Sequence, residues 1–149
     1  MAFYTKYGDL AEYRAALKRA VDDAMDNEIA YNAVLAMQDA IEDLVYDAYD
    51  PEFNVRRMEA GGLIAKANLV PTYIPGTGTL IIEAVAPWQN RGFRHIDGRG
   101  TYGGDLSDVI EHSQIYGAPA RPFAMIAEDK YGRSKFAKDL KSALVRRGF

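Results

Sequence analysis

The chain has 149 residues, which suits one domain, and it carries a net charge of −3 with a sequence pI near 5.4. Its 48% hydrophobic and 26% charged residues are ordinary for a globular protein, and the mildly acidic balance argues against a protein that coats nucleic acid along its whole surface. The absence of cysteine excludes disulfides, thiolate catalysis and Cys-based zinc sites, and no apolar run approaches the ~20 residues that span a bilayer. We expect a protein that is made and used inside the cell, or built into a particle there, with no membrane partner.

The first third of the chain is predicted to form an amphipathic helix. Asp9 and Glu12 have the spacing of a capping box at its start. Apolar positions then recur at helical spacing. They are Leu10, Tyr13, Leu17, Ala20, Val21 and Ala24, and after an interruption Tyr31, Val34, Leu35, Gln38, Ile41, Leu44, Val45 and Ala48. The interruption at residues 26–28 leaves open whether this is one long helix or two with a bend. Pro51 ends the helix, because proline disfavours α conformation in the residue before it.

A small antiparallel sheet is predicted next. Residues 63–70 and 79–86 are apolar runs that tolerate β conformation, and the turn signal of residues 75–78 separates them. The first strand ends near Pro71 or extends through Ile74. Residues 87–105 hold five glycines and three arginines, and we expect a mobile or functional loop there. Residues 107–115 are predicted to return to the sheet.

A C-terminal helix is predicted from Pro122 onward, with an interruption at Gly132. Arg146 and Arg147 fall in its last turn, where cations favour the helix dipole, and Gly148 is a stop signal. The order of elements indicates a single α+β domain over residues 1–149, with helices against one face of an antiparallel sheet.

Residue types that could carry catalysis are present but are not arranged for it. His95 and His112 are the only imidazoles, and no nucleophile with a supporting base is spaced near either. Asp105, Asp108 and Glu111 lie near His112, but solvated acids at a loop–strand junction are the better interpretation than a metal site. The pair of glycines at 76 and 78 is not a dinucleotide fingerprint, because a strand follows where a helix is required. We therefore expect no enzymatic activity, no cofactor and no metal.

Arginine and aromatic residues mark the candidate interaction surfaces. In the 87–105 loop they are Trp88, Arg91, Phe93, Arg94, Arg99 and Tyr102. This set favours a protein interface over phosphate contact with base stacking, given the acidic chain. Arg56, Arg57 and Arg121 lie near Pro51 and Pro122, which fix the local backbone and favour two-point pairing with a neighbour's carboxylates.

The chain resembles the tail-completion (neck) proteins of long-tailed bacteriophages. The matching motif reads tyrosine-x-x-tyrosine-x-proline, an aromatic residue, a basic pair, Gly-Gly-Leu and an asparagine. It is carried here by Tyr46, Tyr49, Pro51, Phe53, Arg56, Arg57, Gly61, Gly62, Leu63 and Asn68. Further points of similarity are residues 120–123, which include Arg121 and Phe123, and the closing residues 140–149. The resemblance covers most of the chain from about Asn32 onward.

The resemblance implies a non-enzymatic virion protein with an α+β fold, assembled in the host cytoplasm. It implies a homo-oligomeric ring, with a hexamer and a dodecamer both open, between the head connector and the tail tube. The implied partners are the head-completion or connector protein and the tail terminator or tail-tube protein, with DNA only as cargo in the channel. The expected interface residues are Tyr49, Pro51, Arg56, Arg57, Trp88, Arg91, Phe93, Arg94, Arg99, Arg121 and Phe123. The alternative is a small nucleic-acid-binding protein or nuclease that uses the 87–105 loop.

Overall fold

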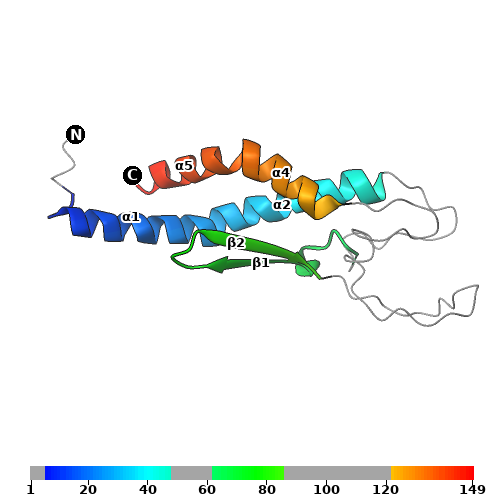
Figure 1. Ribbon diagram of the computed structural model, residues 1–149, viewed down its shortest axis with the longest axis horizontal. Helices are drawn as coiled ribbons and strands as arrows, with labels where there is room; N and C mark the ends of the chain where they lie inside the picture. The colour runs from blue at the N-terminus through cyan, green and yellow to red at the C-terminus, as the bar shows by residue number, and fades with distance from the viewer. Residues whose placement is uncertain (1–5, 48–61, 86–121) are drawn as a thin grey trace, which may run out of the picture.

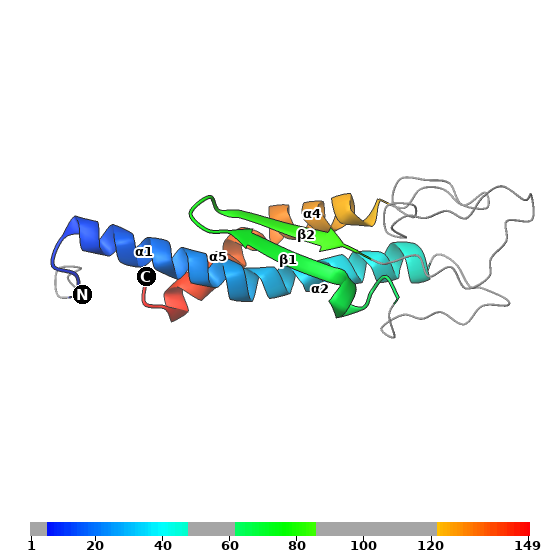
Figure 2. The same ribbon diagram turned by 90° about the horizontal axis from the view of Figure 1, so that it is seen from below.

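A computed structural model describes residues 6–47, 62–85 and 122–149. The architecture is α+β, as predicted: one long N-terminal helical rod, a two-stranded antiparallel hairpin and a C-terminal helical segment. Figure 1 and, after a turn of 90°, Figure 2 show the hairpin and the C-terminal helices along different sides of the rod, which gives an elongated molecule. The elements in order are α1 (Leu10–Ala24), η2 (Met25–Ile29), α2 (Ala30–Ile41), η3 (Glu42–Tyr46), η4 (Lys66–Asn68), β1 (Leu69–Ile74), β2 (Thr79–Ala84), α4 (Phe123–Ser134) and α5 (Phe136–Arg146).

The N-terminal rod begins with the predicted capping box. The backbone N–H of Glu12 donates to Asp9 Oδ1 at 2.8 Å, and the Glu12 carboxylate accepts from the backbone N–H of Gly8 at 2.7 Å. The rod runs without a break from α1 to η3. The first third of the chain is therefore one long helix and not two helices. The polar interruption falls in η2, a wide π-helical turn that buries Met25 and Ile29 on either side of it. An extra residue in such a turn rotates the following helix, and the apolar stripe of α2 then continues toward the core.

The core lies between α2 and the elements that flank it. Val34, Met37 and Ile41 of α2 pack with Leu69 of β1 and Phe123 of α4 in one buried cluster. A second cluster joins Met25, Ile29 and Tyr131, with Tyr73, Leu80, Phe136 and Leu140 packed against it. The buried polar side chain of Gln38 is satisfied, because its Nε2 donates to the carbonyl oxygen of Ile64 at 2.8 Å.

The first strand begins later than predicted. Residues 63–65 are buried but do not belong to a strand, and β1 starts at Leu69. The reason is local: the carbonyl of Gly62 accepts from the N–H of Ala65 at 3.1 Å and from Asn68 Nδ2 at 2.8 Å, which folds this stretch into turns. The apolar run therefore fills the core from a loop and not from a strand.

The hairpin turn is the one the glycines predict. The N–H of Thr77 donates to the carbonyl of Ile74 at 3.3 Å, with Pro75 and Gly76 at the two central positions. The backbone φ angle is +79° at Gly76 and +70° at Gly78, and residues that have a Cβ atom rarely adopt such values. The strands pair antiparallel from Leu69 opposite Ala84 to Ile74 opposite Thr79.

The C-terminal helix is interrupted at Lys135 and not at Gly132 as predicted. Gly132 sits inside α4 with open space around it, so a regular helix passes through it. At Lys135 the backbone turns to φ −114°, while its N–H still donates to the carbonyl of Tyr131 at 3.0 Å. The predicted stop is confirmed: Gly148 has φ +83°, and the N–H of Phe149 donates back to the carbonyl of Leu144 at 3.0 Å.

Three predicted features lie outside the described residues. They are the helix end at Pro51, the loop of residues 87–105 and the strand of residues 107–115.

Candidate functional site

The solvent face of the hairpin is rich in exposed aliphatic side chains, and it also carries Glu83, which lies opposite Val70, and Thr79, which lies opposite Ile74. Val70, Ile74, Ile81 and Val85 are each between 41% and 47% exposed, and they project from alternate positions of the two strands. Thr72 lies opposite Ile81 on the same face. We call these five residues the hairpin face. Branched aliphatic side chains grouped on an exposed sheet are typical of surfaces that bind another protein.

The hairpin is fixed on the rod by a polar contact at its tip. Asp22 of α1 accepts a hydrogen bond from the Tyr73 hydroxyl at 2.6 Å and another from the backbone N–H of Gly76 at 3.1 Å. These two bonds lower the pKa of the Asp22 carboxyl, and the carboxylate raises the pKa of Tyr73. The contact sets the position of the hairpin along the rod, and with it the orientation of the hairpin face.

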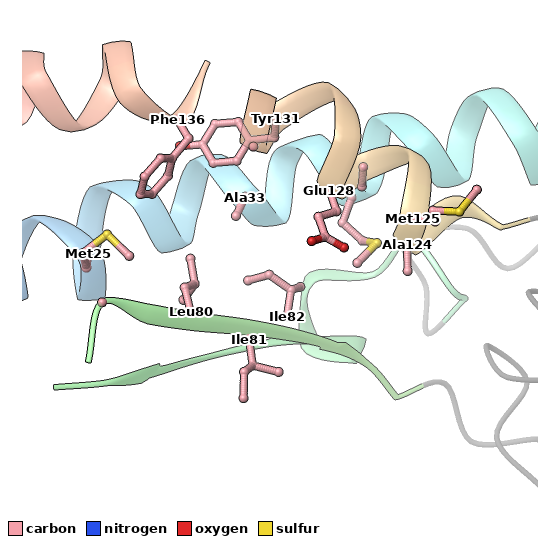
Figure 3. A pocket seen from close by; sticks show the side chains of 14 residues that line it. Met25, Ala33, Leu80, Ile81, Ile82, Ala124, Met125, Glu128, Tyr131 and Phe136 are labelled. Carbon is pink, nitrogen blue, oxygen red and sulfur yellow. The ribbon is translucent and has the colours of Figure 1, made fainter. Parts of the chain in front are cut away.

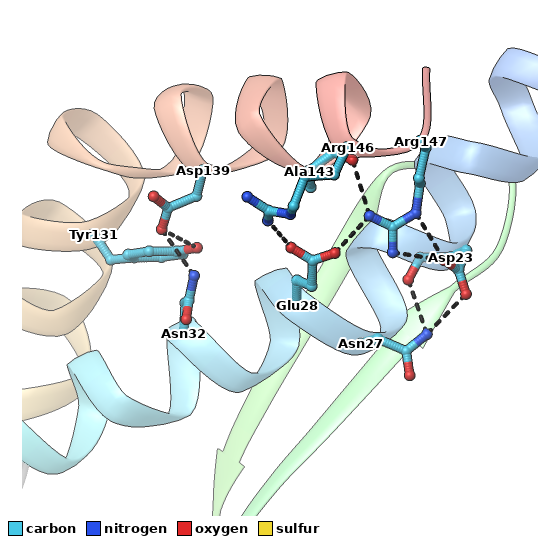
Figure 4. Close-up of polar contacts among 9 residues, drawn as sticks. All are labelled: Asp23, Asn27, Glu28, Asn32, Tyr131, Asp139, Ala143, Arg146 and Arg147. Atoms are coloured by element: carbon cyan, nitrogen blue, oxygen red, sulfur yellow. Dashed lines mark hydrogen bonds and ion pairs between the residues drawn. The ribbon is translucent and has the colours of Figure 1, made fainter. Parts of the chain in front are cut away.

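A second polar cluster fastens the end of α5 to the rod (Figure 4). Arg147 donates from Nε and Nη2 to Asp23 Oδ2, at 2.8 and 2.6 Å, and from Nη1 to Glu28 Oε1 at 2.5 Å. Arg146 pairs with the other oxygen of Glu28. We call these four residues the C-terminal clamp. The guanidinium groups of Arg147 and Arg146 hold the pKa of the Glu28 carboxyl below its ordinary value.

A third polar contact lies between the clamp and the core. Asp139 Oδ2 accepts from Asn32 Nδ2 at 2.9 Å and from the Tyr131 hydroxyl at 3.3 Å (Figure 4). Burial and the Asp139 charge raise the pKa of Tyr131 to about 12. These contacts bridge α2, α4 and α5, so the C-terminal helices are held to the rod by polar bonds as well as by packing.

An apolar groove lies between β2 and α4 (Figure 3). It has a cavity volume of about 630 Å³. Met25, Ala33 and Met37 of the rod form its floor, and Leu80 and Ile82 line one wall. The opposite wall carries Ala124, Ala127, Glu128, Tyr131 and Phe136. Glu128 is the one charged side chain among these lining residues, so the groove suits apolar side chains better than a polar ligand.

Within the described segments, no group of three or more His, Cys, Asp or Glu side chains is placed to hold a metal ion. The helices of those same segments also lack any stretch that is both long and apolar enough to cross a membrane.

Of the eleven predicted interface residues, the structure describes Phe123. Its side chain is fully buried in the first core cluster, where it packs with α2 and Leu69. In this fold Phe123 is a core residue and not a surface residue, because α4 turns its first apolar position toward the rod. The other ten residues lie outside the described ranges, so their partner contacts stay predictions.

The hairpin face was not among the predicted site residues. A signal for it was present in the sequence: residues 80–82 are Leu-Ile-Ile, which do not alternate with polar residues as a half-exposed strand usually does. The clamp also went unrecognised as a tertiary contact, since Arg146 and Arg147 suit the helix dipole without any partner.

These features define an elongated α+β protein that has exposed aliphatic side chains on its hairpin and polar contacts that fix its helices. The chain belongs to the YomN family, whose model matches residues 9–146, and the domain is phage-associated. No curated protein and no solved structure matches the chain.

Proposed function

We propose that the protein is a non-enzymatic structural component of the virion, and that copies of it form a ring in the phage neck. The ring joins the head connector to the tail tube and leaves a channel for DNA. Two sequence observations support this: membership of a phage-associated family, and the motif between Tyr46 and Asn68 that resembles tail-completion proteins.

The structural observation that carries the proposal is the hairpin face. Four of its side chains are branched aliphatics that keep 41–47% of their surface exposed. A ring requires each copy to offer a surface that a neighbour covers, and such a surface is typically less charged than the rest of the molecule. On this face of the two strands Glu83 is the one charged side chain, and the contact of Asp22 with Tyr73 holds the hairpin in place on the rod.

The test is a charge placed on the hairpin face. Ile81→Lys should prevent ring formation, because a buried lysine without a partner opposes association. Its melting temperature should stay within a few degrees of the wild type, since Ile81 is 43% exposed in the single chain. Assembly is measured by light scattering after size exclusion and by negative-stain imaging.

The matched control is Val145→Lys. Val145 is also aliphatic and is 60% exposed, but it lies on α5 away from the hairpin. This variant should assemble as the wild type does. Normal rings from Ile81→Lys would contradict the role of the hairpin face. Salt-sensitive retention on single-stranded DNA by a wild-type protein that forms no ring would favour the nucleic-acid-binding alternative.

A further inference from the structure

The helix α5 contributes little to the buried core. Ala143 is its one buried residue, whereas α2 buries six residues, among them Val34 and Ile41. Phe136 and Leu140 of α5 pack against the second core cluster but are only partly buried. The free energy needed to open a segment depends on the apolar contacts that it buries. Packing therefore holds α5 to the rod less firmly than it holds α2 within the core.

The C-terminal clamp supplies much of the remaining contact between α5 and the rod. The guanidinium of Arg147 lies between Asp23 and Glu28, and Arg146 adds a second bond to Glu28 (Figure 4). Charge-assisted hydrogen bonds of this kind are stronger than neutral ones. The clamp is also within reach of solvent, since the side chains of Asp23 and Glu28 are 59% and 33% exposed. Dissolved salt can therefore screen these charges.

The contacts on either side of the clamp are small. On one side, Asp139 of α5 accepts a hydrogen bond from Asn32 at 2.9 Å. On the other side, the ring centre of Phe149 lies 6.0 Å from that of Tyr7 and 5.9 Å from that of Tyr13, and all three residues are half-buried. These contacts add to the clamp, but they do not form a buried core under α5.

The junction between α4 and α5 has the properties of a hinge. The backbone turns to φ −114° at Lys135, and the Lys135 side chain is exposed. The helix α4 is anchored separately, because Phe123 and Ala127 are buried in the first core cluster and Tyr131 is buried in the second. A change of backbone angle at Lys135 would therefore move α5 away from the rod and leave α4 in place.

We propose that the clamp is an ionic latch, and that α5 opens about Lys135 as a unit while the rod, the hairpin and α4 stay folded. Opening breaks the bonds of Arg147 and uncovers the side of η2 that α5 contacts. This π-helical turn buries Met25 and Ile29, and such turns are frequent at functional sites. Ionic strength thus controls access to this part of the rod. The latch operates within a single chain and does not require a ring.

Native-state amide hydrogen exchange tests whether α5 opens alone. In the wild type, the amides of residues 140–144 should exchange faster than the slowest amides of α2. Their exchange should also depend less steeply on added urea, because a local opening exposes less surface than global unfolding does.

A core substitution separates the two kinds of opening. Ile41 is fully buried in the first core cluster, which stays packed when α5 opens. Ile41→Val should therefore speed exchange at the slowest amides of α2 by about two- to tenfold and leave residues 140–144 unchanged. Equal acceleration in both helices would overturn the proposal, because α5 would then open only when the whole chain unfolds. Wild-type amides of α5 that exchange at the α2 rate would overturn it as well.

Arg147→Ala tests whether the clamp is the latch. It should speed exchange at residues 140–144 by at least about tenfold, because it removes charge-assisted bonds that are present only when α5 is closed. The matched control is Arg133→Ala, which breaks the exposed ion pair with Asp129 on α4 and should leave the same amides unchanged. An equal effect of the two substitutions, or no effect of either, would overturn the assignment of the latch to the clamp.

The dependence on salt tests whether the latch is ionic. In about 1 M NaCl, where charges are screened beyond ~3 Å, exchange at residues 140–144 should become faster in the wild type and change much less in Arg147→Ala. Comparison of the two proteins at each salt concentration cancels the effect of salt on the chemical exchange step. The same response to salt in both proteins would overturn the ionic latch.

Discussion

At the scale of single residues, Arg147 is the polar side chain with the most partners in the described structure. Its guanidinium bonds Asp23, Glu28 and the carbonyl of Ala143, and 20% of its side chain is exposed. Two carboxylates on one side and a helix carbonyl on the other hold the end of α5 against the rod. A planar group with five N–H donors suits this arrangement, which lysine cannot reproduce.

Arg147→Ala should lower the melting temperature by a few degrees, because it removes all of these bonds and leaves Asp23 and Glu28 close together. The loss should shrink in about 1 M NaCl, where charges are screened beyond ~3 Å. Arg133→Ala is the control: Arg133 pairs with Asp129 on the surface of α4 and its side chain is 84% exposed. Thermal unfolding at low and high salt measures both. An equal loss in the two variants would show that the clamp is a surface ion pair of little consequence.

The raised pKa of Tyr131 predicts how the stability of the protein changes at alkaline pH. Its pKa is raised to about 12 in the folded protein, from an ordinary value of 10.0. A group whose pKa is higher when folded contributes stability that is fully present below pH 10.0 and is lost as the pH rises toward about 12. The wild type should therefore lose stability over this range more steeply than Tyr131→Phe. Denaturant unfolding at several alkaline pH values measures the difference.

The control for this measurement is Tyr31→Phe, at a tyrosine that is 54% exposed. It should follow the wild type across the same range. If Tyr131→Phe follows the wild type too, the Tyr131 hydroxyl is not held by burial and Asp139 as the structure shows.

At the scale of elements, two glycines test the assigned turn and the assigned helix. Gly78 has a positive φ in the hairpin turn, whereas Gly132 has a helical backbone inside α4. Gly78→Ala should destabilise the protein by about 1 kcal/mol, because φ +70° disfavours any residue with a Cβ. Gly132→Ala should stabilise it by about 0.5–1 kcal/mol, because Gly132 lies inside α4 with no atom near the added methyl group. Urea unfolding measures both. The same sign for the two changes would contradict one of the two assignments.

Most elements could be predicted from local patterns. The capping box, the 75–78 turn and the Gly148 stop each depend on residues close in sequence, and all three are confirmed. The predicted apolar stripe is confirmed only in part, because Leu10, Tyr31 and Leu35 are exposed while Val34, Gln38 and Ile41 are buried. The late start of β1 could not be predicted. It depends on the hydrogen bonds that the Gly62 carbonyl accepts from Ala65 and Asn68, and the apolar run itself gives no sign of them. The kink at Lys135 was missed because glycine is only weakly unfavourable in a helix that packing supports.

The candidate site was less accessible to prediction than the fold. The clamp joins residues more than a hundred positions apart, such as Asp23 and Arg147, and no local pattern encodes that contact. Phe123 was predicted at an interface because it adjoins Arg121 in a family motif, but sequence adjacency does not show which way a helix faces.

At the scale of the whole molecule, substitutions of the predicted interface arginines should separate effects on assembly from effects on folding. Arg56→Ala, Arg57→Ala and Arg121→Ala should each change stability by less than about 0.5 kcal/mol, because the prediction assigns their partners to a neighbouring chain. Each should weaken joining of heads to tails, since loss of one side of a buried charge pair costs ~2–5 kcal/mol at an interface. Thermal unfolding and an in vitro joining assay measure the two effects. A markedly lower melting temperature would assign these arginines to the fold of the single chain.

The most direct measurement is electron microscopy of lysates from a phage that lacks the gene for this chain. A ring that joins head to tail predicts that filled heads and complete tails both accumulate without joining. Addition of the purified wild-type protein should restore joined particles, and addition of Ile81→Lys should not. Joined, infectious particles at normal yield in the absence of the chain would contradict a role in the neck.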